Sequence, residues 1–177
     1  MTLALSPSQI SIMEAHAERV YPEECCGLLV GQIDSAENRE LLKSVVEVVL
    51  LDNEWTPEII ESEITESEIA EVDLSKAINK RRRYWIDPKD MLRVQKASRD
   101  KGLNIIGIYH SHPDHLAVPS ECDRVQAWPQ YAYVIMSVCN GKAVDMQNWA
   151  LDSNRQFQPE AIRVSPSSAR DRMPVSA

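Results

Sequence analysis

The stretch Ile105–Trp128, IIGIYHSHPDHLAVPSECDRVQAW, contains three of the four histidines in this chain. It begins with apolar residues typical of a buried strand, expected at residues 104–109, and continues into a polar loop. A helix is then expected over residues 119–128, where Ser120 can cap the N-terminus. The histidines therefore lie where a buried strand gives way to a loop.

Two longer helices are predicted upstream of this stretch. The first covers residues 6–24, because Ser6 can cap it, a proline follows and apolar residues recur at helical spacing. The second covers residues 87–102, since Asp87 can cap it and Gly102 can end it. Both segments therefore carry start signals as well as the helical period.

Apolar runs bounded by turn residues predict the strands. They are residues 25–33, 44–51, 82–86, 104–109, 131–138, 143–151 and 157–164. The last three are expected to form an antiparallel meander. Helices that alternate with strands indicate an α/β (α+β) fold, in which a mixed, largely antiparallel sheet is wrapped by helices.

A single domain is expected over residues 1–164, because 177 residues provide one well-buried core. Residues 52–79 contain nine acidic residues against one lysine, and we expect an acidic insertion that projects as a mobile loop or loose helix. It could be a solvated loop, or a lid or docking element over a substrate groove. Residues 165–177 are expected to be a disordered tail.

The composition argues against several classes of protein. A net charge of −8 does not suit a nucleic-acid binder, and the basic run at residues 80–83 is expected to be a solvated strand entry. No apolar run reaches the roughly 20 residues of a membrane helix. With no signal-peptide pattern and no disulfide framework among four cysteines, a cytoplasmic protein with reduced thiols is expected.

The histidine spacing predicts a metal site. His110 and His112 occupy positions i and i+2, which point to one face of a strand, so both imidazoles can bind one ion. Asp123 lies in the first turn of the following helix. Two nitrogens and one carboxylate oxygen suit Zn²⁺, and three protein ligands leave the fourth position for water, as in catalytic sites.

A simpler interpretation of the same residues is helix capping. Ser120 and Asp123 form the S-x-x-D pattern of a capping box, and a lone H-x-H is often incidental. Capping explains none of the histidines, however, and the two roles are compatible. His115 is expected to face solvent from its loop, while Cys122 would point about 100° away from Asp123 on a helix.

The segment HSHPDHLAVPSECD, residues 110–123, has the pattern H-x-H-P-x6-S-x-x-D and resembles the signature of the JAMM/MPN+ metalloproteases. The segment YPEECCGLLVG resembles the setting of the upstream glutamate in that family and places it at Glu24 rather than Glu23. The similarity extends through residues 81–113 and 120–138. The acidic segment is longer than in compact bacterial members, which puts substrate access in doubt.

The resemblance implies roles for five residues. His110, His112 and Asp123 would bind one catalytic zinc ion with its water. Glu24 would accept a proton from the zinc-bound water and later deliver it to the leaving amine. Ser120 would donate its hydroxyl to the oxyanion of the tetrahedral intermediate. The implied fold is of the MPN/JAMM type, with layering like that of cytidine deaminases.

The resemblance to the prokaryotic single-domain branch also implies a substrate class. It predicts a zinc metallopeptidase or isopeptidase that hydrolyses an amide bond at the extended C-terminal tail of a ubiquitin-fold or sulfur-carrier protein. Such a tail could add along a sheet edge and enter a groove toward the zinc. Residues 117–120 and the strand at 82–86 are the expected groove walls.

Three other functions compete with this hypothesis. A non-catalytic MPN-type scaffold would lack metal ligands, yet all five residues are present. A zinc deaminase needs H-x-E and P-C-x-x-C, which the sequence lacks. A cysteine hydrolase lacks a convincing Cys–His–acid arrangement, and Cys25 and Cys26 are expected to be small buried hydrophobic residues. His16 is expected to be exposed in the middle of its helix.

Overall fold

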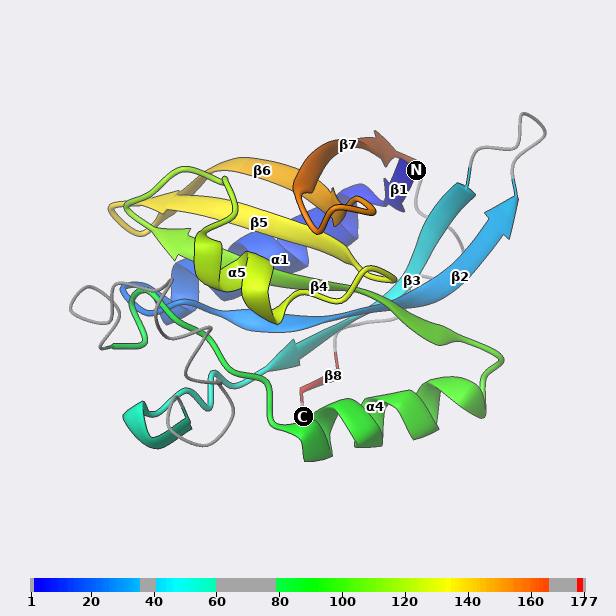
Figure 1. Cartoon of the computed structure of the whole chain (residues 1–177), viewed down its shortest axis with the longest axis horizontal. Helices are drawn as coiled ribbons and strands as arrows, with labels where there is room; N and C mark the ends of the chain where they lie inside the picture. Colours follow the sequence, from blue (N-terminus) through cyan, green and yellow to red (C-terminus); the bar gives the residue numbers. More distant parts are fainter. Residues whose placement is uncertain (1, 36–40, 60–78, 166–174, 177) are drawn as a thin grey trace.

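The computed structural model describes residues 2–35, 41–59, 79–165 and 175–176 (Figure 1). Strands and three helices account for most of these residues. In chain order they are β1 (Thr2–Leu5), α1 (Pro7–Val20), β2 (Cys26–Ser35), β3 (Leu41–Leu51), α4 (Pro88–Arg99), β4 (Asn104–Pro113), α5 (Glu121–Gln126), β5 (Ala132–Cys139), β6 (Lys142–Leu151), β7 (Phe157–Val164) and β8 (Val175–Ser176).

The strands form one sheet in the order β1-β7-β6-β5-β4-β2-β3-β8, and β1 also pairs with β3, so that seven strands close on themselves. The expected mixed sheet with helices is confirmed. Among the described strands, however, four pairings are antiparallel and four are parallel, so the sheet is not largely antiparallel. The reason is β1, which the sequence analysis missed and which pairs in parallel with both β3 and β7.

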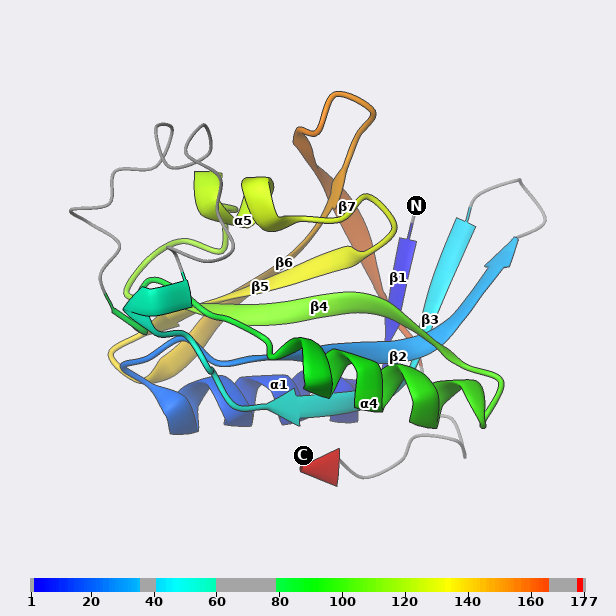
Figure 2. The same ribbon diagram turned by 60° about the horizontal axis from the view of Figure 1, so that its bottom comes forward.

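The parallel pairing of β4 with β5 positions the functional residues. Parallel neighbours require a long crossover connection, and here residues 114–131 supply it and include α5. The crossover leaves the C-terminal end of β4 and passes through α5, which lies alongside β4 and β5, before it reaches the start of β5 (Figures 1 and 2). Residues from β4 and from α5 are therefore brought to the same region.

Two apolar clusters fill the two sides of the strands. In the first, Met13 and Ala17 of α1 pack with Leu29 and Val134 of the sheet. The second, on the α4 side, includes the following buried residues: Leu28, Val30, Val94, Ile105, Ile108 and Tyr133. Along β4 the side chains change sides, because Tyr109 belongs to the first cluster and Ile108 to the second.

The capping signals in the sequence are confirmed, but the first helix ends at Val20 and not at residue 24 as predicted. The Ser6 hydroxyl accepts from the Gln9 amide at 3.3 Å, and Gln9 Oε1 accepts from the Ser6 amide at 2.9 Å, which is a capping box. Asp87 caps α4 through a 2.7 Å bond from the Lys89 amide. Gly102 ends that segment with φ of +69°, a conformation that glycine adopts readily. Within the described residues, no helix combines the length and apolar character needed to cross a membrane.

The strand predicted at residues 82–86 is wrong. Its backbone groups bond to the Asn53 side chain, which accepts from the Trp85 amide at 3.1 Å and donates to the Arg83 carbonyl at 2.8 Å. The Glu54 amide also donates to the Trp85 carbonyl at 3.0 Å. An extended segment whose polar groups are satisfied in this way needs no neighbouring strand.

The start of the acidic segment differs from the prediction as well. Asn53 and Trp55 are buried, so these residues belong to the domain and do not project from it. Residues 60–78 of the predicted insertion lie outside the described residues. In the tail predicted to be disordered, β8 pairs in parallel with β3, while residues 166–174 and 177 also lie outside the described part.

His16 is buried rather than exposed, which corrects the prediction for this residue. Its side chain is 3% exposed, and its Nδ1 lies 2.8 Å from the hydroxyl of Tyr109 on β4. Burial and the nearby Arg19 lower the pKa of His16 to about 4, against a smaller opposing effect of Asp52. His16 is therefore neutral in the folded protein at neutral pH.

This burial predicts a pH dependence of stability. Between pH 6.5 and pH 4 the unfolded chain protonates His16 and the folded chain does not, so the free energy of unfolding falls as pH falls through this window. His16→Gln keeps a polar partner for Tyr109 but removes the titrating group. In urea unfolding at pH 7 and pH 4.5, the wild type should lose more stability than this variant. Equal losses would contradict the assignment.

Candidate active site

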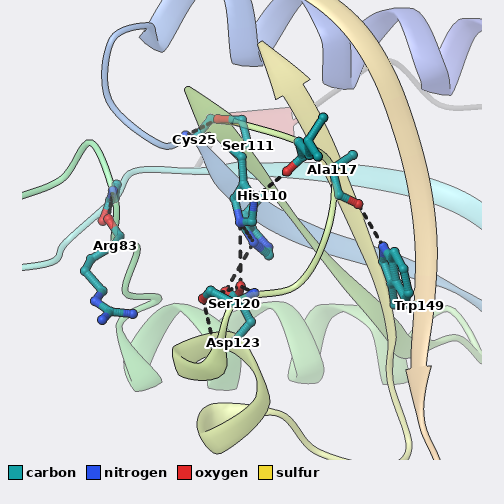
Figure 3. Close-up of polar contacts among 11 residues, drawn as sticks. Cys25, Arg83, His110, Ser111, Ala117, Ser120, Asp123 and Trp149 are labelled. Carbon is teal, nitrogen blue, oxygen red and sulfur yellow. Dashed lines mark hydrogen bonds and ion pairs between the residues drawn. The ribbon is translucent and has the colours of Figure 1, made fainter. Parts of the chain in front are cut away.

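His110 and His112 of β4 point to the same side of the sheet, as their spacing predicts. Their Nε2 atoms lie 3.0 Å apart. From α5, Asp123 places Oδ1 3.3 Å from His110 Nε2 and Oδ2 3.6 Å from His112 Nε2 (Figure 3). One ligand atom from each of the three buried residues lies within 4.8 Å of the others. The structure thus brings together the three residues predicted to bind metal.

The hydrogen bond from His112 to Leu116 orients the other ring nitrogen, Nε2, toward His110 and Asp123. His112 Nδ1 lies 2.9 Å from the carbonyl oxygen of Leu116. Because a carbonyl only accepts, Nδ1 of His112 carries a proton, so Nε2 is the nitrogen that a metal ion would bind. Two imidazoles and one carboxylate are a typical donor set for catalytic Zn²⁺. The residues present therefore fit a zinc ion.

The state of charge in the cluster also suits a cation. Burial lowers the pKa of His110, which favours the neutral imidazole that binds metals, whereas the contacts of His112 with Asp123 outweigh burial and raise the pKa of His112. Burial opposes ionisation of Asp123, but the adjacent His110 and His112 hold the pKa of Asp123 well below its usual value. The Asp123 carboxylate is therefore negative. The ring of Tyr84 stacks on His110 with centroids 4.5 Å apart and limits how His110 can turn.

Ser120 and Asp123 form the capping box that the sequence predicted for α5. The Ser120 hydroxyl and amide each donate to Asp123 Oδ2 at 2.6 Å, and the Asp123 amide donates to the Ser120 hydroxyl at 3.2 Å. The same carboxylate thus caps the helix and faces the histidines. Ser120 can donate to another acceptor only by rotating its hydroxyl away from Asp123.

Glu24 lies two residues before β2 and is 5% exposed, whereas Glu23 is exposed. Its backbone is fixed at both ends, because its amide donates to the Lys80 carbonyl at 2.7 Å and its carbonyl accepts from Asn53 Nδ2 at 2.9 Å. Burial, with a smaller effect of Asp123, raises the pKa of Glu24 to about 8. A cation bound nearby would favour the ionised form.

A pocket of about 400 Å³ lies beside Glu24, His112 and Ser120. It is lined by Glu24, Arg82, Arg83, His112, His115, Leu116, Val118 and Ser120. His115 is exposed, as predicted, and lies outside the ligand cluster. Cys25 and Cys26 are buried, also as predicted. The pocket gives a ligand access to Glu24, His112 and Ser120 together.

Two residues that shape this site carry no signal in the sequence. Tyr84 stacks on His110, and Asn53 joins the backbone of Glu24 to that of Arg83. Asn53 lies in the segment predicted to project, and Tyr84 in the segment predicted to be a strand. Neither belongs to a spacing motif, so only the tertiary structure identifies them.

Residues 6–152 match the family described as prokaryotic homologs of the JAB domain. The chain belongs to the prokaryotic JAB family. The resemblance inferred from the histidine motif is thereby confirmed. The match covers all five residues to which that resemblance assigned roles, since they lie between Glu24 and Asp123.

Two curated proteins are similar to part of this JAB domain. The desampylase of Haloferax volcanii is 42% identical over 55 residues, which is 30% of this chain and 40% of that protein. The probable TtuB-protein conjugate cleaving protease of Thermus thermophilus is 42% identical over 52 residues, or 29% of this chain and 35% of that protein. The chain thus matches less than half the length of each relative.

Solved structures show the same fold over nearly the whole chain. A protein from Desulfitobacterium hafniense has a TM-score of 0.70 at 24% identity, covering 96% of both chains. A protein from Salinibacter ruber has a TM-score of 0.59 at 26% identity, covering 98% of this chain and 95% of the other. The JAB fold of this chain is therefore shared by proteins of low sequence identity.

Proposed function

We propose that this JAB domain is a zinc-dependent peptidase or isopeptidase that hydrolyses an amide bond at the C-terminal tail of a ubiquitin-like or sulfur-carrier protein. The observation that carries the proposal is the buried cluster of His110, His112 and Asp123, of which His112 lines a pocket together with Glu24 and Ser120. The names of the two relatives, a desampylase and a conjugate cleaving protease, support the class of substrate.

His110, His112 and Asp123 would hold the zinc ion. When bound, zinc acts as a Lewis acid that polarises a carbonyl and makes a water molecule acidic near neutral pH. The chain fixes the three ligands in different ways: Leu116 orients His112, Tyr84 packs against His110, and Ser120 holds Asp123. Such outer contacts orient ligands and raise metal affinity.

Glu24 would move the proton in the reaction. It is the carboxylate that lines the pocket beside His112, and its backbone bonds to Lys80 and Asn53 fix its position. A general base needs a pKa near the working pH, and burial already moves Glu24 in that direction. Glu24 would accept a proton from the attacking water and pass it to the leaving amine.

Ser120 would stabilise the negative charge that develops on the carbonyl oxygen. Its side chain lines the pocket, and rotation from Asp123 would turn the hydroxyl toward the substrate. Arg82 and Arg83 also line the pocket, so the segments at 117–120 and 82–86 both contribute residues to its walls. A narrow tail between them would place its amide near Glu24.

The role of Ser120 predicts a selective loss of turnover. Ser120→Ala should lower kcat about 10²–10³-fold, because it removes a hydroxyl donor to the oxyanion. The variant also loses a helix cap, at a cost of about 0.5–2 kcal/mol in the free energy of unfolding. Steady-state kinetics together with zinc content and urea unfolding separate the two effects. Ser120→Thr, which keeps the hydroxyl, should recover much of the activity; an unchanged kcat in folded Ser120→Ala would refute the role.

The substrate class is tested by incubating the zinc-loaded protein with ubiquitin-fold carrier proteins that bear C-terminal extensions. Intact-mass measurement should show loss of the extension after the carrier tail. The same carrier conjugated to a lysine side chain tests the isopeptide reaction. Binding of a carrier without any cleavage, at full zinc occupancy, would instead favour a non-catalytic scaffold and contradict the proposal.

A further inference from the structure

Two residues of the basic run at 80–83 lie at the candidate active site, and the strand that this run was predicted to enter is not formed, although Arg81 and Arg82 are exposed as predicted. Arg82 and Arg83 line the same pocket as Glu24 and His112. Arg81 differs from them, because it lies outside that pocket and pairs with Asp114 at 3.6 Å. Two of the consecutive arginines thus face the site where the amide would be cleaved, and the third does not.

The backbone that carries these arginines is fastened to Glu24. The Lys80 carbonyl accepts from the Glu24 amide at 2.7 Å. Asn53 Nδ2 donates to both the Arg83 carbonyl, at 2.8 Å, and the Glu24 carbonyl, at 2.9 Å. Asn53 itself is buried. These bonds fix the backbone of the arginines relative to the backbone of Glu24.

In the described part of the chain, the guanidinium groups of Arg82 and Arg83 have no ion-pair partner. Arg82 is exposed and Arg83 is half-buried. Figure 3 shows Arg83 to one side of the cluster formed by His110 and Asp123. A guanidinium offers a planar set of N–H donors that matches a carboxylate through two parallel hydrogen bonds. As far as the described residues go, both groups line the pocket without an ion-pair partner, where a negatively charged ligand could meet them.

We propose that Arg82 and Arg83 bind a carboxylate on the substrate residue next to the scissile amide. The proposal rests on the proposed function and narrows its substrate class to tails with a negative charge beside the cleaved bond. That charge is either the free α-carboxylate of a short C-terminal extension or the side chain of an acidic residue. The exposed Leu116 and Val118, on the same pocket, would contact the apolar part of the tail.

The charge distribution of the chain supports this choice of ligand. The protein as a whole carries a net charge of −8, so an acidic substrate gains little attraction from the surface at large. Arg82 and Arg83 supply positive charge at the pocket itself. In a partly buried site such a pair attracts a carboxylate more strongly than it would in bulk water. Arg82 and Arg83 would therefore select for a negative charge close to the scissile bond and not for an acidic substrate in general.

Three labelled hexapeptides test the proposal by fluorescence anisotropy. The first ends in Gly-Gly-Ala with a free carboxylate, the second is its C-terminal carboxamide, and the third ends in Gly-Gly-Glu-carboxamide. Each is titrated with zinc-loaded protein that carries Glu24→Gln, so that the probes are not turned over. The first and second peptides differ only in the terminal charge, and the third moves this charge to a side chain.

The free acid should bind at least about tenfold more tightly than its carboxamide, the ratio expected for one charge-assisted hydrogen bond. Adding Arg82→Gln and Arg83→Gln should bring this ratio close to one. Adding Arg81→Gln, the matched control, should leave it unchanged. Tight binding of the glutamate peptide as well would identify a side-chain carboxylate as an accepted source, and weak binding would restrict the site to the α-carboxylate.

Equal affinities for the first and second peptides, or a ratio that survives the double substitution, would overturn the proposal. These affinity ratios do not depend on turnover. Cleavage is measured separately, with Glu24 present, in the carrier-protein assay. A charge preference without cleavage would therefore count against the proposed function alone, and cleavage without a charge preference would count against the arginine site alone.

Discussion

Glu24→Gln is expected to bind zinc as tightly as the wild type and to hydrolyse its substrate about 10²–10⁴-fold more slowly. Glutamine occupies nearly the same volume and preserves the backbone bonds to Lys80 and Asn53, but it cannot take a proton. Zinc content and kcat on a carrier protein with a C-terminal extension measure the two quantities. The loss should fall on kcat, because the proton transfer occurs in the transition state.

Glu23 provides the matched control for this substitution. It is adjacent in sequence and exposed, while Glu24 is buried and lines the pocket. Glu23→Gln should therefore cleave at the wild-type rate. If Glu24→Gln also cleaves at that rate while remaining folded, the assignment of Glu24 as general base is wrong.

His112→Ala is expected to abolish both zinc binding and cleavage. The substitution removes one of three ligand atoms and also removes the hydrogen bond between His112 and the Leu116 carbonyl. Loss of the Lewis acid removes several kcal/mol of transition-state stabilisation, so the rate should fall at least about 10³-fold. Metal analysis after dialysis and the carrier-cleavage assay check the two results.

The matched control here is His115→Ala. His115 follows His112 by three residues and lines the same pocket, but it is exposed and lies outside the ligand cluster. This variant should keep its zinc and should remain an active hydrolase. Zinc retained at full occupancy by His112→Ala would show that the ion is held elsewhere. Circular dichroism of each variant establishes that the fold is intact.

Much of the group of candidate metal ligands could be predicted because its geometry depends on local structure. His110 and His112 share a face through the period of a strand, and Asp123 lies in the first turn of a helix whose cap is Ser120. The long helices were predictable for the same reason, since caps and period lie within a few residues of one another. Such features depend little on the rest of the chain.

The parts that could not be predicted depend on distant residues. β1 is a short apolar run at the N-terminus, and its partners β3 and β7 begin about 40 and 155 residues later. Asn53 replaces a strand ladder for the segment at 82–86, and His16 is buried because Tyr109 of β4 offers it a hydrogen bond. No spacing pattern in the sequence indicates these pairings.

Asn53 also explains why the basic run could not be assigned from the sequence. Four consecutive basic residues usually form a solvated surface. Here the Asn53 side chain and the Lys80 carbonyl bond to the backbone of Glu24, and Arg82 and Arg83 are thereby carried to the pocket. The location of the arginines is a property of these long-range hydrogen bonds rather than of the run itself.

Anomalous diffraction from crystals of the zinc-loaded protein, recorded at the zinc absorption edge, tests the central claim most directly. We expect one strong peak per chain at about 2.0–2.2 Å from Nε2 of His110, Nε2 of His112 and a carboxylate oxygen of Asp123. A crystal soaked in zinc that shows no peak between these three side chains, or a peak held by other residues, would contradict the account.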